Sequence, residues 1–157
     1  MKICIIGSGY VGLVSGACFS DLGNTVTCVD IKKDIIEKLN KGIIPIYEPG
    51  LQELVLRNLK KKRLLFTTDI SSSIKKSDII FICVGTPTKN NKADLKYVIN
   101  VVNTIKSNLN RYKIIVTKST VPVTTGDKIA KILKSNKNKN KFDVVSNPEF
   151  LREGEAI

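Results

Sequence analysis

The sequence predicts an α/β fold in which helices cover both faces of a doubly wound parallel sheet. Short runs rich in Ile and Val alternate with longer segments of helical periodicity along the 157 residues, a pattern typical of parallel βαβ units. The run at 79–84 (IIFICV) is apolar throughout, as expected of a strand buried on both faces. A glycine-rich GxGxxG turn joins the first strand-like run to the first helical segment, which indicates a Rossmann domain.

The first half of the chain is expected to alternate strands with helices. Gly23 and Gly42 follow the first two helical segments, at positions where a left-handed residue would end them. In the second of these helices, Ile35, Ile36 and Leu39 share one face that can pack on the sheet. The expected elements are a strand at 2–7, a helix at 10–22, a strand at 25–30, and helices at 32–41 and 51–61.

The second half is expected to continue the alternation. Asp94 is a candidate N-cap for one of its helices, and Gly126 leaves the start of another ambiguous. The polar run 136–141 (NKNKNK) is expected to be a surface loop. The expected strands are 64–67, 79–84, 113–118 and 143–146, and the expected helices are 95–109 and 124–135. Six such strands match the order 3-2-1-4-5-6, which binds ligands at the carboxyl ends of its strands.

Composition and charge exclude several classes of function. No apolar stretch approaches the roughly 18 residues needed to span a bilayer, so no membrane partner is expected. The net charge of +12 comes mostly from scattered Lys. Aromatic residues do not interleave with the basic clusters, as single-strand nucleic-acid binders require. A solvated, Lys-rich surface explains the charge, and a nucleic-acid partner is not expected.

The four cysteines indicate buried free thiols. Cys4, Cys18, Cys28 and Cys83 each lie in an apolar run and form no CxxC pair, and the chain contains no His. Their spacing suits no zinc module, so no metal site is expected. Free thiols suit a reducing cytoplasm, where we expect the protein to be located. Because they lie in strands or on the packing face of the first helix, none is expected to be a nucleophile.

The GxGxxG turn (GSGYVG, residues 7–12) predicts a dinucleotide site because it directly follows a strand and opens a helix. Gly7 permits the tight turn, and Gly9 allows a pyrophosphate to approach the backbone. Gly12 allows the helix to pack closely on the sheet. The free N–H groups of the helix N-terminus would then face the phosphate charge.

Asp30 is the expected partner of the cofactor's ribose. It ends the second expected strand, 18 positions after Gly12, where a carboxylate accepts hydrogen bonds from the ribose hydroxyls of NAD. The same charge would repel the 2′-phosphate of NADP, so NAD is the predicted cofactor. Two alternatives remain: Asp30 could instead cap the following helix, and Lys32 and Lys33 could tolerate a phosphate.

Seven segments resemble the UDP-glucose/GDP-mannose dehydrogenase family. They occur in the family's order and cover essentially the whole chain, which identifies residues 1–157 as the NAD-binding Rossmann domain. The segments are 7–12 (GSGYVG), 45–51 (PIYEPGL), 66–69 (FTTD), 84–88 (VGTPT), 93–98 (ADLKYV), 118–123 (KSTVPV) and 147–156 (NPEFLREGEA). The resemblance implies that a nucleotide sugar is the substrate, and that two NAD molecules oxidise its primary alcohol to a carboxylate.

Further residues are expected at the cofactor. Gly85, Thr86 and Pro87 would shape a loop along the dinucleotide, although an ordinary turn is the alternative. The sequence Lys118-Ser119-Thr120 would bring hydroxyls near the nicotinamide, although these could instead cap the next helix. The expected cofactor-binding residues, besides the three glycines and Asp30, are Tyr10, Val11, Lys33, Gly85, Thr86, Pro87, Ser119, Thr120 and Glu153.

The segment 147–154 is expected to carry the catalytic and sugar-binding residues. If it is helical, Glu149 and Glu153 lie on one face, and a solvated helix face is the alternative. The resemblance implies that Glu149 orients or activates water at the sugar with the help of Thr120. It also implies that Glu153 lies near the nicotinamide ribose and that the substrate passes Phe150, Leu151 and Arg152.

The resemblance also implies a catalytic residue and a connecting helix beyond the motifs quoted above. In the family, a cysteine of a second domain captures the intermediate covalently, and a long helix links the domains. We expect both to lie outside these 157 residues and the full-length form to be a homodimer. UDP-glucose is favoured by residues 118–123 and Gly154, with GDP-mannose or a non-catalytic NAD-binding module as alternatives. One departure is Ile35, where the family often has a basic residue; Lys33 could substitute for it.

Overall fold

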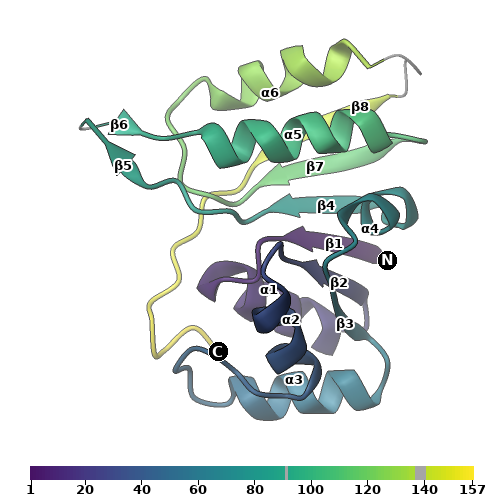
Figure 1. Cartoon of the computed structure of the whole chain (residues 1–157), viewed down its shortest axis with the longest axis vertical. Helices are drawn as coiled ribbons and strands as arrows, with labels where there is room; N and C mark the ends of the chain where they lie inside the picture. Colours follow the sequence, from purple (N-terminus) through teal and green to yellow (C-terminus); the bar gives the residue numbers. More distant parts are fainter. Residues whose placement is uncertain (91, 137–140) are drawn as a thin grey trace.

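The computed structural model describes residues 1–90, 92–136 and 141–157. Within them, one sheet of parallel strands runs in the order β3-β2-β1-β4-β7-β8 (Figure 1). Because β5 and β6 lie outside this sheet, the order of its own strands is the predicted 3-2-1-4-5-6. The strands are β1 (Lys2–Ile6), β2 (Thr25–Val29), β3 (Leu64–Thr67), β4 (Ile79–Ile82), β7 (Lys113–Thr117) and β8 (Phe142–Ser146).

Helices pack on both faces of the sheet, as predicted. Alternate residues of a strand point to opposite faces, and in β1 Ile3 and Ile5 join one core cluster while Cys4 and Ile6 join the other. The first cluster is covered by α1 (Tyr10–Asp21), α2 (Lys33–Asn40) and α3 (Leu51–Lys60). The second is covered by α4 (Ile70–Lys76), α5 (Lys96–Asn108) and α6 (Thr125–Lys134). The predicted helices and strands are all present, with ends shifted by a few residues at most.

Helix α4 was not predicted from the sequence. Three serines in its seven residues lower its intrinsic helix propensity, so contacts at its two ends stabilise it. At the start, the Asp69 carboxylate accepts a hydrogen bond from Ser72 N at 3.0 Å. After its end, the fully buried Lys113 donates from Nζ to Ser77 O at 2.5 Å. Only the tertiary structure brings Lys113 to this place.

The hairpin of β5 (Thr88–Lys89) and β6 (Lys92–Ala93) was also not predicted. Each strand has two residues, too few for a periodic pattern to be recognised. Asp94, which follows it, does not have the predicted role of N-cap, because Leu95 occupies that position in α5. The Asp94 carboxylate still accepts a hydrogen bond from Lys96 N at 2.9 Å. Of the expected surface loop at 136–141, residues 137–140 lie outside the described residues.

The segment 147–157 is not helical, so the condition under which Glu149 and Glu153 would share a helix face is not met. Pro148 has no N–H to donate, and Gly154 is left-handed with φ of 88°. The segment leaves β8 and crosses the edge of the sheet to end beside α3 (Figure 1). Glu149 and Glu153 therefore do not share a helix face. No described helix has the length and apolar character that a membrane crossing requires.

Replacing Asp69 with Ala tests the account of α4. The substitution removes the side-chain acceptor from the helix N-terminus, so we expect the free energy of unfolding to fall by about 1 kcal/mol. Urea denaturation followed by circular dichroism measures this change. Asp69→Asn keeps an acceptor and is expected to stay near the wild-type value. Equal losses for both variants would contradict the capping role.

Candidate functional site

The turn after β1 approaches its neighbours too closely for side chains. Gly7 has φ of 105°, and a Cβ on it would lie 2.6 Å from the carbonyl oxygen of Cys83. A Cβ on Gly12 would lie 1.8 Å from the carbonyl oxygen of Gly7. Gly7 N also donates to Val29 O at 2.8 Å. The turn is therefore held between the ends of β2 and β4, and α1 starts directly on top of it.

The start of α1 is free to meet an anion. Gly9 is the N-cap and supplies no side-chain hydrogen bond to the first turn, so the N–H groups there have no capping side chain. Nothing lies within 4 Å of the position that a Cβ on Gly9 would occupy. Open space, N–H groups without a partner among the described residues, and the helix dipole together fit a pyrophosphate.

Asp30 lies directly after β2 and fixes the glycine turn. Its Oδ2 accepts a hydrogen bond from Ser8 N at 2.9 Å, and its Oδ1 accepts one from Lys32 N at 3.1 Å. The sequence had not indicated the bond from Ser8 N. The bond from Lys32 N is a contact with the N-cap residue of α2. A carboxylate has about four lone-pair positions, so both oxygens can still accept ribose hydroxyls. Asp30 therefore does not cap α2, whose N-cap is Lys32, and its ribose role stays a prediction.

A cavity of about 270 Å³ opens beside the glycine turn. It is formed by the start of α1, the loops that follow β4 and β7, and the segment after β8. These segments meet because the carboxyl ends of parallel strands share one edge of the sheet. The lining residues are Gly9, Tyr10, Val11, Cys83, Val84, Gly85, Thr86, Lys118, Ser119, Thr120 and Glu149.

The loops after β4 and β7 are bonded to each other. Ser119 is buried, and its Oγ donates to Val84 O, at 2.6 Å. The Thr86 hydroxyl donates to Thr120 O at 2.8 Å. The Ser119 hydroxyl therefore points its proton at the protein backbone, and it does not cap α6, whose N-cap is Thr124. These bonds hold Thr120 at the wall of the cavity.

The segment after β8 brings one predicted carboxylate to the cavity. Glu149 lines it, and its Oε2 accepts a hydrogen bond from Leu151 N at 3.0 Å. Leu151 is half-buried against the core cluster beneath α1, α2 and α3. Phe150 is 91% exposed, and Arg152 forms an ion pair with Glu155 at 2.9 Å.

The cavity brings together many of the residues singled out in the sequence. Those that line it are Gly9, Tyr10, Val11, Gly85, Thr86, Ser119, Thr120 and Glu149. Those outside its lining are Gly7, Gly12, Asp30, Lys33, Pro87, Phe150, Leu151, Arg152 and Glu153. Lys33 is exposed at the start of α2, and Ile35 is half-buried against the core, so Ile35 is a packing residue in this chain. Lys118 and Val84 also line the cavity and had been noticed only as parts of longer motifs.

Glu48 was missed as a candidate residue, although it lies in the segment 45–51. It is buried, and its Oε2 accepts a hydrogen bond from the Tyr10 hydroxyl at 2.5 Å. The same oxygen accepts one from Gly154 N at 2.7 Å, and Oε1 accepts one from Ala156 N at 2.8 Å. These bonds lower the pKa of Glu48 below its ordinary value, the Tyr10 bond most strongly. Glu48 is therefore an anion held by backbone N–H groups and a phenol.

The cysteine thiols are unreactive in their surroundings. Burial raises the pKa of Cys4 and that of Cys83 to about 12, and it raises the pKa values of Cys18 and Cys28 as well. Cys83 lies one residue beyond β4, is half-buried and lines the cavity, so its expected place within that strand is corrected. The nearby Lys118 charge opposes this rise in the pKa of Cys83 but does not cancel it.

Comparison with known proteins agrees with this geometry. The model described as "UDP-glucose/GDP-mannose dehydrogenase family, NAD binding domain" matches residues 1–157. The chain is 58% identical over 158 residues to the UDP-glucose 6-dehydrogenase TuaD of Bacillus subtilis. It is 51% identical over 159 residues to a UDP-glucose 6-dehydrogenase of Rhizobium meliloti. The alignments cover 99% and 100% of this chain but 34% and 36% of those proteins, so it spans about a third of their length.

Solved structures share the fold over the whole chain. The UDP-glucose dehydrogenase of the archaeon Pyrobaculum islandicum has a TM-score of 0.93 at 38% identity, covering 98% of this chain and 37% of that one. The GDP-mannose dehydrogenase of Pseudomonas aeruginosa has a TM-score of 0.95 at 38% identity, covering 100% of this chain and 38% of that one. The predicted fold class and family resemblance are confirmed.

Alkylation by iodoacetamide tests the state of the thiols. A pKa of about 12 in place of 9.0 leaves about a thousandfold less thiolate at neutral pH. We therefore expect Cys4 and Cys83 to react at least about a hundredfold more slowly in the native chain than in urea. The native rate should rise with pH, since deprotonation supplies the thiolate. Rapid native modification of Cys83 in neutral buffer would mean that it is an activated thiol.

Proposed function

The chain belongs to the UDP-glucose/GDP-mannose dehydrogenase family as its NAD-binding domain, and on that basis we propose that it is the cofactor half of a UDP-glucose 6-dehydrogenase. The reaction would oxidise UDP-glucose to UDP-glucuronate with two NAD. The observation that carries this proposal is the cavity where the uncapped start of α1 meets Thr120 and Glu149. It combines features of an NAD site with a carboxylate that NAD binding alone does not require.

NAD supplies the hydride acceptor when it is bound, and the chain's own residues hold and orient it. Gly7 and Gly12 shape the turn, and Gly9 with the first turn of α1 would receive the pyrophosphate. Asp30 would accept hydrogen bonds from the ribose hydroxyls, and its charge disfavours the 2′-phosphate of NADP. The other residues assigned to the cofactor are Tyr10, Val11, Lys33, Gly85, Thr86, Pro87, Ser119, Thr120 and Glu153.

The sugar end of the site would be formed by the loop after β7 and the segment after β8. The Thr86–Thr120 bond fixes the Thr120 backbone, while no hydrogen bond within the described residues uses the Thr120 hydroxyl. One oxygen of Glu149 accepts from Leu151 N, which leaves the other to accept a proton or orient a water molecule. Phe150, Leu151, Arg152 and Glu153 would contact the nucleotide sugar and the nicotinamide ribose as this segment passes them.

The remaining chemistry would belong to a second domain. The described thiols have raised pKa values, which suits packing and not nucleophilic attack. We therefore assign the cysteine that captures the oxidised intermediate to a C-terminal domain joined through a linking helix, in a full-length homodimer. The reducing cytoplasm is the compartment that suits these free thiols.

A GDP-mannose substrate is the second candidate, because the GDP-mannose dehydrogenase of Pseudomonas aeruginosa matches the fold over the entire chain. The two candidates differ in the base and in the sugar, and neither difference touches the NAD half of the cavity. Thermal protection of the full-length protein by UDP-glucose and not by GDP-mannose would favour the first candidate. The reverse result would favour the second.

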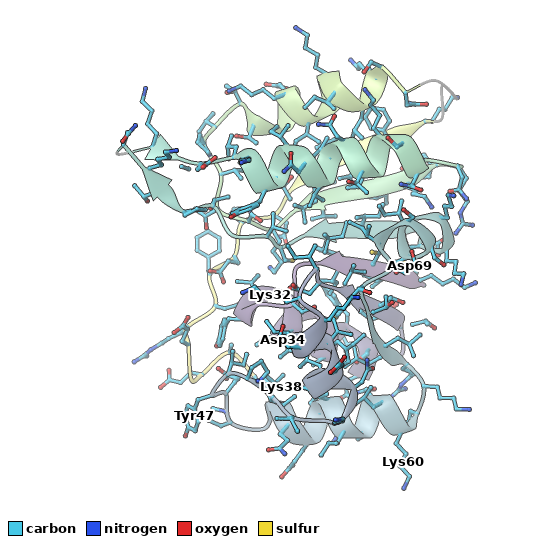
Figure 2. All side chains as sticks on the ribbon, viewed as in Figure 1. Lys32, Asp34, Lys38, Tyr47, Lys60 and Asp69 are labelled. Carbon is cyan, nitrogen blue, oxygen red and sulfur yellow. The ribbon has the colours of Figure 1, made fainter. Side chains whose placement is uncertain are left out.

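Replacing Asp30 with Ala tests the NAD site. A hydrogen bond to a charged group contributes about 1.5–3 kcal/mol, so we expect NAD affinity to fall about tenfold to a hundredfold. Isothermal titration calorimetry measures it. Asp34→Ala is the matched control, because it removes the same charge from the exposed first turn of α2, near Lys32 and Lys38 (Figure 2). Unchanged affinity in Asp30→Ala, or equal losses in both variants, would refute the assignment of Asp30.

Turnover by the isolated chain tests whether these residues can complete the reaction without the proposed second domain. We expect these 157 residues to bind NAD and to form no NADH with UDP-glucose, because the nucleophile and the rest of the sugar site are assigned to another domain. NADH absorbance followed over time measures this. A longer version that includes the second domain is the positive control. Sustained UDP-glucose-dependent turnover by the 157 residues alone would overturn the assignment.

A further inference from the structure

The Glu48 carboxylate joins three parts of the molecule that are far apart in the sequence. It lies in the loop between α2 and α3, next to Tyr47, which is 85% exposed, whereas Glu48 itself is 7% exposed (Figure 2). Its acceptor bonds reach the first residue of α1 and the backbone of the segment after β8, 106 and 108 positions away. No ion pair with Glu48 is found in the described ranges. Hydrogen bonds therefore stabilise this buried charge.

The donors form a small anion-binding nest. Gly154 N and Ala156 N donate to different oxygens of Glu48. The left-handed φ of 88° at Gly154 allows the N–H groups of Gly154 and Ala156 to face one anion, while Glu155 N between them donates to Arg152 O at 3.1 Å. A carboxylate that accepts several N–H bonds and one O–H bond has its lone pairs largely satisfied. The pairing is specific, because Gly154 N and Ala156 N use different oxygens of Glu48, and an amide at position 48 would turn its NH2 group toward one of them.

The segment that carries Glu149 is thus held at both ends. At its start, Asn147 N donates to Thr117 O at 2.9 Å, which continues the pairing of β8 with β7. Near its end, Glu48 binds Gly154 and Ala156. Between these two points the segment is irregular, so it cannot fix its own path through a helix or strand ladder. Apart from the packing of Leu151 and Ala156 against the core, the Glu48 bonds are the main restraint on its second half.

We propose that Glu48 is a positioning residue for the sugar end of the site, because its carboxylate holds the segment 147–157 and the Tyr10 ring together at the wall of the cavity. The proposal rests on the proposed function, since it assigns Glu48 a role in the same nucleotide-sugar site. Glu48 does not line the cavity and touches no reacting group. It acts through Tyr10, which lines the cavity, and through the backbone that leads to Glu149.

The Glu48 bond also controls the protonation of Tyr10. Burial and then the hydrogen bond to the Glu48 carboxylate raise the pKa of Tyr10 from 10.0 to about 12. The phenol thus remains neutral through the range in which an ordinary tyrosine ionises. Its proton points at Glu48 and its oxygen lies 3.3 Å from Arg152 O. The Glu48 carboxylate therefore contributes to both the position and the protonation of the Tyr10 side chain.

Glu48→Gln is the direct test, because it keeps the size of the side chain and removes its charge. We expect the amide protons of Gly154 and Ala156 to exchange at least about tenfold faster, measured by NMR on the 157-residue chain. Ring-labelled tyrosine should show the pKa of Tyr10 lowered from about 12 toward its ordinary value, while burial still holds it above 10.0. NAD affinity should fall about threefold to tenfold, because Tyr10 and Glu149 lose their fixed places. Unchanged amide exchange in a folded Glu48→Gln variant would overturn the proposal.

Asp143→Asn is the matched control. Asp143 accepts a hydrogen bond from the Tyr112 hydroxyl at 2.5 Å, and this bond raises the pKa of Tyr112 in the same way. The pair lies outside the cavity lining. We expect Asp143→Asn to lower the pKa of Tyr112 while the exchange at Gly154 and the affinity for NAD stay unchanged. A loss of amide protection equal to that of Glu48→Gln would mean that the effect is general, which contradicts the proposal.

A pH titration of the unaltered chain gives a second test that needs no substitution. The Gly154 and Ala156 amide resonances should shift together as Glu48 is protonated, at a pH below its ordinary pKa of 4.5. The bonds are complete above that pH and are lost as the pH falls through the lowered value. Independent shifts, or none, would refute the proposal. Exchange and titration use no NAD, so they remain decisive even if the chain does not bind NAD.

Discussion

The close approach of backbone segments at the carboxyl ends of β1 and β4 is the constraint on which the rest of the structure depends. The Gly7 turn fits between Val29 and Cys83 only without a side chain, and Gly12 places α1 against that turn with no room for a Cβ. These contacts aim the N-terminus of α1 into the cavity. The parallel sheet then brings the loops after β4, β7 and β8 to the same edge.

Carboxylates that accept backbone N–H groups fix the irregular parts of this frame. Asp30 holds the glycine turn through Ser8 N, Asp69 starts α4 through Ser72 N, and Glu48 holds the final segment through Gly154 N and Ala156 N. Charge-assisted bonds of this kind are stronger than neutral ones, so a single side chain can position a turn that has no regular structure. Under the proposed function, the carboxylates of Asp30 and Glu48 would also prepare the site, so that structure and function would be coupled at these two residues.

Periodic patterns predicted the sheet, its strand order and most helices. Elements that are buried on one face or on both carry apolar residues at regular spacings, and these spacings can be recognised in the sequence. Ile36 and Leu39 are buried as their spacing predicted. Helix α4 was missed because its serines have weak propensity and Lys113, which bonds to its end, lies far along the chain. The sequence also left open whether the segment 147–154 is helical. Its irregular path depends on the hydrogen bond from Gly154 N to Glu48, 106 positions away, which no local sequence pattern indicates. In the sequence, Glu48 could therefore be recognised only as part of the segment 45–51, without a role of its own.

The central claim is that the start of α1, Asp30 and the loops after β4 and β7 form one NAD site. A crystal structure of the chain with NAD tests it most directly. The account predicts the pyrophosphate at Gly9 and the first turn of α1, a ribose on Asp30, and the nicotinamide toward Thr120 and Glu149. NAD bound elsewhere, or bound at Gly9 with its ribose away from Asp30, would contradict the account.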